Sequence, residues 1–446
     1  MTIRRSLQLA VCCAAFALSR GAVAQSDIAI GYQGLPAKAL RGGGGGTQLS
    51  ESVLLHAGIG VEAGYDSNVF YGDKGFAVSS PIVRVLPFVE ITNAARSGTV
   101  PSGVFFDIGV SAAYRRYLSN DPQPQSPNKK ISDESEFLPS ANGIVEFSPG
   151  QTLSILVSDV FSRFEDAPYI TSTGRTGPLI RYVNSSSAQL RFAPGGGRLQ
   201  STVRYDNTYD AFSSDSGLSF ANSINHQLTL DLSWKWLPKT AIFVSASQGY
   251  VSYLNDQSMQ MGDTRKVDSY PFHSAVGLRG LVTQKTSVNL WVGYSNAIYV
   301  SGPNPEGLQG HINANAEVTV RPTVLTTLGA NYRHDFQNAV IGNFYYVDGG
   351  AAWLQQMVGS RVSATLSGRY EHRVFQFISA RRTDNFLQLG AVVDFHPKPW
   401  GYIGAAYSSV INDSAVPEAS GMPGTPAPSG ANYVKHQIFG RVGVTY

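Results

Sequence analysis

The sequence is poor in charge, in cysteine and in long apolar runs. Only 15% of its 446 residues are charged, against about a quarter in ordinary soluble domains. Its two cysteines, Cys12 and Cys13, are adjacent and lie near the N-terminus. No apolar run is long enough for a membrane-spanning helix, and the hydrophobic fraction of 43% is below what a helical membrane protein needs.

Recognisable catalytic and ligand-binding motifs are also absent. The glycine run 42–46 is not followed by Gly-Lys-Ser/Thr, so it does not form a phosphate-binding loop. The sequence has no H-E-x-x-H, no G-x-S-x-G and no histidine cluster with metal-ligand spacing. A formal net charge of +3 is too small to indicate a nucleic-acid partner. We therefore expect no enzyme activity, no cofactor, no metal and no nucleic acid.

The N-terminus has the pattern of a secretory signal peptide over residues 1–24. Arg4 and Arg5 form its charged region, a short apolar stretch follows, and Ala22-Val23-Ala24 is a cleavage signal. Cleavage there leaves a chain without cysteine. Residues 25–51 have little apolar patterning, so we expect a flexible periplasmic segment that either hangs free or plugs a lumen. Residues 52–446 are then a single domain.

That domain is built from segments in which apolar and polar residues alternate. The clearest runs from Ile224 to Trp236, with leucine and tryptophan on one parity and Asn, Gln, Thr, Asp and Lys on the other. A period of two predicts β-strands with one apolar and one polar face. Such strands reconcile low charge with modest hydrophobicity, because only every second residue of a membrane barrel strand faces lipid.

The connections between these segments alternate in length. Short turns such as Leu237–Lys239 and Arg321–Thr323 alternate with long polar stretches such as Asn255–Lys266 and Asp413–Ala431. Tight periplasmic turns and long outer loops produce this rhythm in bacterial outer-membrane barrels. We therefore predict an all-β fold, a transmembrane antiparallel up-and-down β-barrel of about 18 strands, with 16 to 18 as the range.

Aromatic residues on the apolar parity fall near the two ends of the predicted strands. Amphipathic rings favour the two membrane interfaces. The predicted membrane girdles comprise Tyr114, Tyr209, Trp234, Trp236, Tyr294, Tyr332, Tyr370, Phe395, Tyr407 and Tyr446.

The last strand, Tyr433–Tyr446, ends the chain on an aromatic residue after alternating apolar residues. It resembles the C-terminal signal of bacterial outer-membrane β-barrels, which the barrel-assembly machinery reads. The resemblance implies a multi-pass barrel in the bacterial outer membrane, in contact with outer-membrane lipid and lipopolysaccharide. An ordinary closing strand of a soluble β domain is the alternative.

A second resemblance lies at the end of the first strand. Gly64-Tyr65-Asp66-Ser67-Asn68-Val69-Phe70 is similar to the Tyr-Asp-x-Asn-Val-Phe pattern near the start of the β-barrel porin 2 family. Members of that family are outer-membrane barrels often found with exopolysaccharide assembly systems. The resemblance implies polysaccharide export and periplasmic polysaccharide-export proteins as partners. Locally, Asp66, Ser67 and Asn68 are also residues that end strands in turns.

The polar parity of the strands is predicted to line a water-filled lumen. Its two signs of charge nearly balance, which suits a neutral or weakly charged hydrophilic solute, or else ion-pair networks that stiffen the wall. Trp291, with Tyr299, Phe344 and Tyr346, is also expected to face inward. The predicted pore-lining residues are Arg84, Arg115, Arg204, Asp206, Asp231, Arg279, Trp291, Glu317, Arg321, Arg333, Asp335, Asp348, Arg361, Arg369, Glu371, Arg373, Asp394 and Arg441.

The function expected from these features is passage of hydrophilic material across the outer membrane, with export of a secreted polysaccharide as the leading possibility. A passive diffusion porin for small solutes is the first alternative. A closed structural or adhesion barrel is the second.

Overall fold

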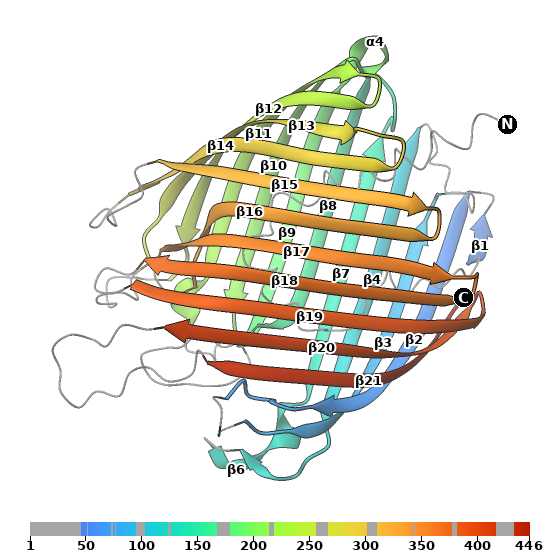
Figure 1. Cartoon of the computed structure of the whole chain (residues 1–446), viewed down its shortest axis with the longest axis vertical. Coiled ribbons are helices and arrows are strands. Elements are labelled where there is room, and N and C mark those ends of the chain that lie inside the picture. Colours follow the sequence, from blue (N-terminus) through green and yellow to red (C-terminus); the bar gives the residue numbers. More distant parts are fainter. Residues whose placement is uncertain are drawn as a thin grey trace.

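The computed structural model describes most of the chain as one closed antiparallel sheet (Figure 1). The described residues are 46–50, 52–72, 75, 77–94, 103–123, 126–166, 179–213, 218–255, 266–300, 310–340, 343–376, 381–415 and 432–446. The predicted signal peptide, and the predicted periplasmic segment apart from residues 46–50, lie outside them.

The sheet has nineteen strands, of which β1 is a short addition and the other eighteen form the barrel. The strands are β1 Thr47–Ser50, β2 Val53–Asp66, β3 Ser80–Thr92, β4 Val104–Tyr117, β7 Glu136–Phe147, β8 Leu153–Asp166, β9 Leu179–Phe192, β10 Leu199–Phe212, β11 Ser223–Leu237, β12 Thr240–Tyr253, β13 Ser269–Leu281, β14 Thr286–Tyr299, β15 His311–Thr323, β16 Thr326–Asn338, β17 Phe344–Val358, β18 Val362–Gln376, β19 Arg381–Lys398, β20 Gly401–Ala415 and β21 Tyr433–Thr445. A separate hairpin joins β5 Pro122–Gln123 to β6 Ser126–Lys130.

Each barrel strand pairs with its neighbours along the chain, and β2 pairs with β21 to close the ring. The predicted antiparallel up-and-down barrel of about 18 strands is therefore confirmed. In the described residues no helix is both long enough and apolar enough to cross a membrane.

The C-terminus and β1 mark one end of the barrel, which we call the inner end (Figure 1). The amide of Tyr446 donates to the carbonyl of Ala57, 2.7 Å away. β1 pairs with Val53–Leu55 of β2, beyond the point where β21 ends. The final residues of the predicted periplasmic segment thus form a strand at the inner rim.

Connections at the inner end are mostly short, and most of those at the opposite, outer end are longer, as predicted. One inner turn is the four-residue α4, Pro194–Gly197, where Gly195 and Gly196 take positive φ. The outer connections carry two short 3₁₀ turns, η2 Ile131–Glu134 and η4 Ser219–Ala221.

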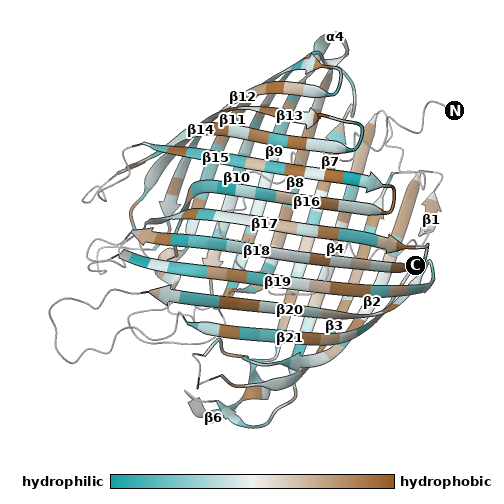
Figure 2. Cartoon of the chain, viewed as in Figure 1, coloured by the Kyte–Doolittle hydropathy of each residue, from teal (hydrophilic) through white to brown (hydrophobic). Residues whose placement is uncertain are grey.

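Hydrophobic and hydrophilic residues alternate along the strands (Figure 2), and many of the large hydrophobic ones are exposed on the outward face. Along β21 the outward Val434, Ile438, Val442 and Val444 are 43–57% exposed while their neighbours point into the lumen. Without lipid such a surface would face water, so it requires an apolar surround. All the predicted girdle residues are exposed large side chains on this face: Tyr114, Tyr209, Trp234, Trp236, Tyr294, Tyr332, Tyr370, Phe395, Tyr407 and Tyr446.

Charged side chains from the first and last strands meet on the inward face, across the closing seam. Glu62 of β2 is fully buried, with one oxygen 2.6 Å from Arg84 of β3 and the other 3.7 Å from Arg441 of β21. Arg441 also lies 3.4 Å from Asp394 of β19. The guanidinium of Arg84 stacks 3.8 Å from the ring centre of Phe439. Two arginines and two carboxylates therefore bridge the strands that close the barrel.

Glu62→Gln should destabilise the barrel strongly, because it leaves two buried guanidinium groups without their shared carboxylate. Breaking a buried ion pair in this way costs about 3–5 kcal/mol. This loss of stability can be measured by urea unfolding in detergent and by the loss of heat-modifiable migration on gels. Asp231→Asn is the matched control: its partner Arg279 is 34% exposed, so the cost should stay below about 1 kcal/mol. Equal costs for the two variants would contradict this role for Glu62.

Candidate functional site: the barrel lumen and its outer mouth

Most of the predicted pore-lining residues lie on the inward face, as the strand register shows. Two do not. Asp348 points outward, where its Oδ1 accepts hydrogen bonds from Tyr332 (3.1 Å) and from His334 Nδ1 (2.5 Å). The prediction for Asp348 was wrong because it assigned the wrong parity to β17. Tyr345 and Val347, which alternate with Asp348 along the strand, are the residues that face inward, where they are buried in an apolar cluster. Arg361 lies in the exposed inner turn before β18, so it is not part of the wall.

The inward face of β13–β18 carries a row of residues in register. The chain of direct partners runs from Gly277 through Trp291, Asn315, Arg333 and Gly349 to Glu371, one residue on each strand. Directly paired residues in neighbouring strands lie about 5 Å apart. An indole, an amide, a guanidinium and a carboxylate therefore follow one another around the wall.

A second row lies on the next inward positions towards the inner end. It comprises Arg279, Asn289, Glu317, Asn331, Ala351 and Arg369. We call the polar residues of both rows the lumen strip: Trp291, Asn315, Arg333, Glu371, Arg279, Asn289, Glu317, Asn331 and Arg369. The strip brings together six residues that the sequence predicted separately, while its three asparagines were not predicted to line the pore.

Two glycines make room for the large side chains of the strip. A Cβ added at Gly277 would lie 2.6 Å from the Cβ of Trp291, and one at Gly349 would lie 2.8 Å from Cγ of Glu371. Real Cβ atoms do not approach this closely, so any larger residue would displace the indole or the carboxylate. The two glycines thus leave the space in which both groups lie against the wall.

At the outer mouth, the connection after β2 folds into the lumen. We call residues Ser67–Gly72 the inward loop; Val69 is 0% and Phe70 7% exposed. Asn68 shapes it: its side-chain oxygen accepts from the Gly72 amide (2.8 Å), and its amide nitrogen donates to the Gly72 carbonyl (2.8 Å). The same nitrogen donates to the carbonyl of Val434 at 3.1 Å, which ties the loop to β21.

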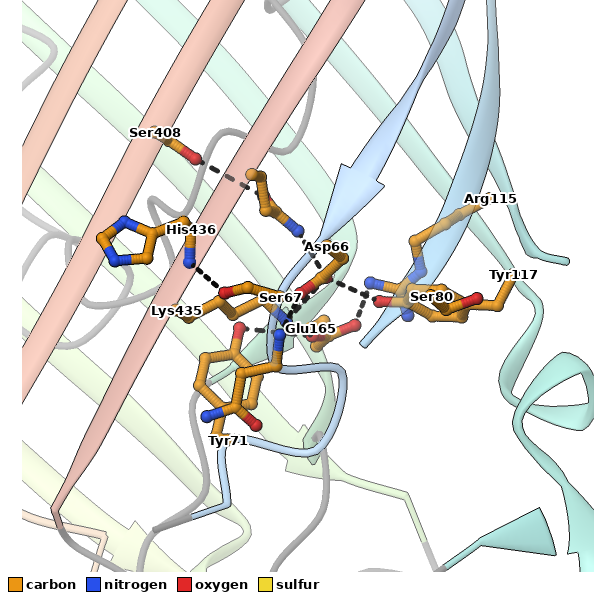
Figure 3. Close-up of polar contacts among 12 residues, drawn as sticks. Asp66, Ser67, Tyr71, Ser80, Arg115, Tyr117, Glu165, Ser408, Lys435 and His436 are labelled. Atoms are coloured by element: carbon orange, nitrogen blue, oxygen red, sulfur yellow. Dashed lines mark hydrogen bonds and ion pairs between the residues drawn. The ribbon is translucent and has the colours of Figure 1, made fainter. Parts of the chain in front are cut away.

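A buried ion cluster holds the inward loop against the wall (Figure 3). Asp66 Oδ2 lies 3.0 Å from Lys435 Nζ and accepts from Tyr117 (3.2 Å). Glu165 from β8 pairs with Arg115 of β4 and accepts from the Tyr71 hydroxyl at 3.2 Å. The side chains come from four strands and the loop, so this arrangement exists only in the closed barrel.

Tyr71 is the loop residue with the most partners in this cluster. Its ring lies 4.0 Å from Lys435 Nζ and meets the Tyr433 ring edge-on at 5.2 Å. Its φ of 53° is uncommon for a residue other than glycine. Sequence reasoning assigned Asp66 and Asn68 to the family-like 64–70 segment and to a turn that ends a strand, and it missed Glu165 and Lys435. The Asp-x-Asn spacing was the one available signal, since Asp66 Oδ1 accepts from the Asn68 amide at 2.9 Å.

Two other outer connections also contribute to the mouth. Leu218, beside η4, and Val340, between β16 and β17, are buried in one apolar cluster with Tyr345 and Phe375. The rings of Tyr345 and Phe375 stack at 4.9 Å. Phe344, Tyr346 and Tyr299 form a neighbouring cluster with Ala297. These aromatic residues therefore pack against one another at the outer end.

Lys266, between β12 and β13, is buried in the same region. Its Nζ donates to the carbonyl of Ala339 and lies 5.2 Å from the ring centre of Tyr253. Burial lowers the pKa of Lys266 to about 7; nearby Arg181 adds to the shift and Asp210 opposes it. Among the described residues, no group of three or more His, Cys, Asp or Glu is placed to hold a metal ion.

No protein-family model and no curated protein matches this sequence. Solved structures of similar fold include the siderophore receptor PirA from Pseudomonas aeruginosa, at 9% identity, TM-score 0.41, with 88% of this chain and 80% of that one covered. The FrpB iron transporter from Neisseria meningitidis is similar at 10% identity and TM-score 0.43, covering 92% and 83% of the two chains.

The protein is a multi-pass β-barrel of the bacterial outer membrane. A closed ring of eighteen antiparallel strands pairs every strand on both sides, and its apolar outward face is bordered by aromatic residues. Closed barrels of this kind are the β-structures that satisfy backbone hydrogen bonds within a bilayer.

Tyr71→Ala should widen the outer mouth, because it removes the contacts that hold the inward loop to Glu165, Lys435 and Tyr433. We expect larger single-channel conductance in planar bilayers than for the parent protein. Tyr205→Ala is the control, since that tyrosine points outward and bonds His226 at 2.8 Å. Unchanged conductance in Tyr71→Ala would show that the inward loop does not narrow the lumen.

Lys266 predicts a pH dependence of stability. Its pKa is about 7 when folded, below the roughly 10.4 of an unfolded lysine. The unfolded chain therefore binds the extra proton in this window, so stability should rise with pH between about 7 and 10, by about 1 kcal/mol per pH unit. Urea unfolding at pH 7 and 9.5 tests this. The rise should shrink in Lys266→Met and persist in Lys239→Met, which changes an exposed inner turn.

Proposed function

We propose that this protein is a channel that passes hydrophilic saccharides across the outer membrane, with export of a secreted polysaccharide as its principal role. The lumen strip is the observation that carries the proposal. Its amides, guanidinium groups and carboxylates can donate to and accept from sugar hydroxyls. Trp291 offers an apolar ring face beside these polar groups, which is the combination that saccharide rings bind.

The length of the strip favours a chain over a single sugar. Trp291 and Arg333 are two strands apart, or about 10 Å, and Glu371 lies two strands further along the same row. A linear oligosaccharide can contact several of these positions at once, whereas a monosaccharide touches one or two. Export in company with periplasmic polysaccharide-export proteins follows from the resemblance of the 64–70 segment to the β-barrel porin 2 family, and it belongs to this proposal.

A passive diffusion porin for small solutes is the second candidate. The inward loop favours it, because side chains that fold into the lumen limit the size of solute that passes. The two candidate functions differ in the length of saccharide that can enter the barrel. They also differ in the process that the cell loses when the gene is disrupted.

Proteoliposome swelling with glucose and with maltooligosaccharides of increasing length tests passage. We expect Trp291→Ala to slow the longer sugars several-fold more than glucose, because the stacking surface matters only for a chain. Trp400→Ala, in an exposed inner turn, should leave all rates unchanged. Swelling with glucose alone, insensitive to Trp291, would instead support a small-solute porin. No swelling with any sugar would indicate a closed barrel.

Disrupting the gene tests the export role. The proposal expects less secreted polysaccharide with unchanged uptake of small solutes. Normal polysaccharide with reduced uptake would refute export and leave the porin.

A further inference from the structure

The outer ends of β16 and β17 part from the barrel wall on one side. β15 and β16 are paired up to Ala314 and His334, and no pairing between them follows in the described residues, although β15 extends to His311. By contrast, β16 and β17 stay paired with each other to their outer ends, and β17 stays paired with β18. We call residues 335–340 and 343–347, which lie beyond this separation, the lid hairpin.

Two aromatic residues show that the lid hairpin bends into the lumen. Phe336 and Tyr346 have the parity of the outward-facing residues on their strands, so on straight strands they would face lipid. Instead, Phe336 is 6% exposed and its ring stacks on His273 of β13 at 5.2 Å. His273 faces inward, hydrogen-bonded to Ser295 of β14 at 2.7 Å, and β13 is three strands from β16, or about 14 Å along the wall. The ring of Tyr346 lies 4.2 Å from that of His311 on β15. The lid hairpin therefore leans over the inward face of β13–β15.

The other side of the lid hairpin reaches the far wall of the barrel. Val340 and Tyr345 are each 1% exposed. They share one buried apolar cluster with Leu179 of β9, Phe212 of β10 and Leu218. Around the closed ring, β17 is the eighth strand from β9 in one direction and the tenth in the other, so the two strands lie on opposite walls (Figure 1).

The width of the barrel shows what this cluster means. A round barrel of eighteen strands is about 35 Å across, from a strand spacing of ~4.8 Å and a tilt of ~40°. Two side chains on straight, opposite walls cannot meet over that distance. The cluster exists because the lid hairpin lies inside the mouth, between the walls.

Polar contacts join the tip of the lid hairpin to a second outer connection. The Nζ of Lys266 donates to the carbonyl of Ala339, and the side-chain oxygen of Asn343 accepts from the Val267 amide at 3.3 Å. Lys266 and Val267 belong to the connection between β12 and β13. The tip is thus held by a segment across the lumen from β18, the strand that anchors its base.

We propose that the lid hairpin is a gate, closed in this structure, that swings outward about His334 and Asp348 to open the outer mouth. Burial of its apolar side chains on both sides stabilises the closed position. Because its base is paired with the wall only through β18, a few residues at the base can absorb the movement. The gate controls the saccharide passage proposed above, and its role rests on that function.

Single-channel conductance in planar bilayers tests the gate without any sugar. Val340→Asp places a charge in the buried cluster, where an unpaired charge is costly, so the lid hairpin should leave the mouth. We expect conductance several-fold above that of the parent protein. Val324→Asp, in a fully exposed inner turn, is the matched control and should conduct like the parent. Parent-like conductance in a folded Val340→Asp barrel would overturn the gate.

A disulfide gives a second test that adds no charge to the cluster. Cleavage of the predicted signal peptide leaves no cysteine, so Val267→Cys combined with Asn343→Cys can form one bond only. The contact between these positions brings them together in the closed lid. The oxidised variant should stay at low conductance, and reduction with dithiothreitol should restore opening events like those of the parent.

Three outcomes of the disulfide experiment would overturn the gate. They are failure of the bond to form on oxidation, openings that persist in the oxidised protein, and silence both before and after reduction. The swelling assay with sugars decides the proposed function separately. If the conductance tests succeed and no sugar enters, the gate stands and saccharide passage fails.

Discussion

Pairing of β2 with β21 is the constraint on which the rest of this structure depends. A sheet in a bilayer cannot leave an edge strand with unpaired amides and carbonyls, so the first and last strands must meet. On the outward face, the seam is apolar like the rest of the wall. On the inward face, Glu62, Arg84, Arg441 and Asp394 join strands from opposite ends of the chain. The ring thus closes through backbone hydrogen bonds between β2 and β21 and through buried ion pairs on the inward face.

The same geometry explains why the lumen holds so many charged groups of both signs. Every second residue of each strand points inward, and the lumen is where a chain that must present apolar residues to lipid can place its polar ones. Most of these charges neutralise one another locally. They stiffen the wall, and they leave binding to the places where polar groups remain exposed to the lumen. The lumen strip, with Trp291 at one end and Glu371 at the other, is such a place.

The outer mouth shows how a short segment acquires a role from its surroundings. Asp66 and Asn68 shape the inward loop by local hydrogen bonds. Its position, however, depends on Glu165 and Lys435, which are far away in sequence. The mouth and the seam share β21, so a change at Lys435 would act on loop position and on barrel closure together. The position of the inward loop and the stability of the closed ring are therefore coupled at this end of the barrel.

The sequence by itself determined the fold class, the approximate strand number and the alternation of short and long connections. These follow from local rules: a period of two, turn-forming residues, and the need to hide apolar parity from water. It also determined inward or outward facing wherever the alternation was regular, as in β11. The sequence did not predict correctly which way Asp348 faces. Glycines and aromatic residues occur on both parities of β17, so neither parity could be recognised as the apolar, outward one. Only the tertiary structure decided which inward residues meet, because register across strands depends on the closed ring. Trp291, Arg333 and Glu371 are separated by dozens of residues along the chain, and hydrogen bonding between neighbouring strands places them in one row.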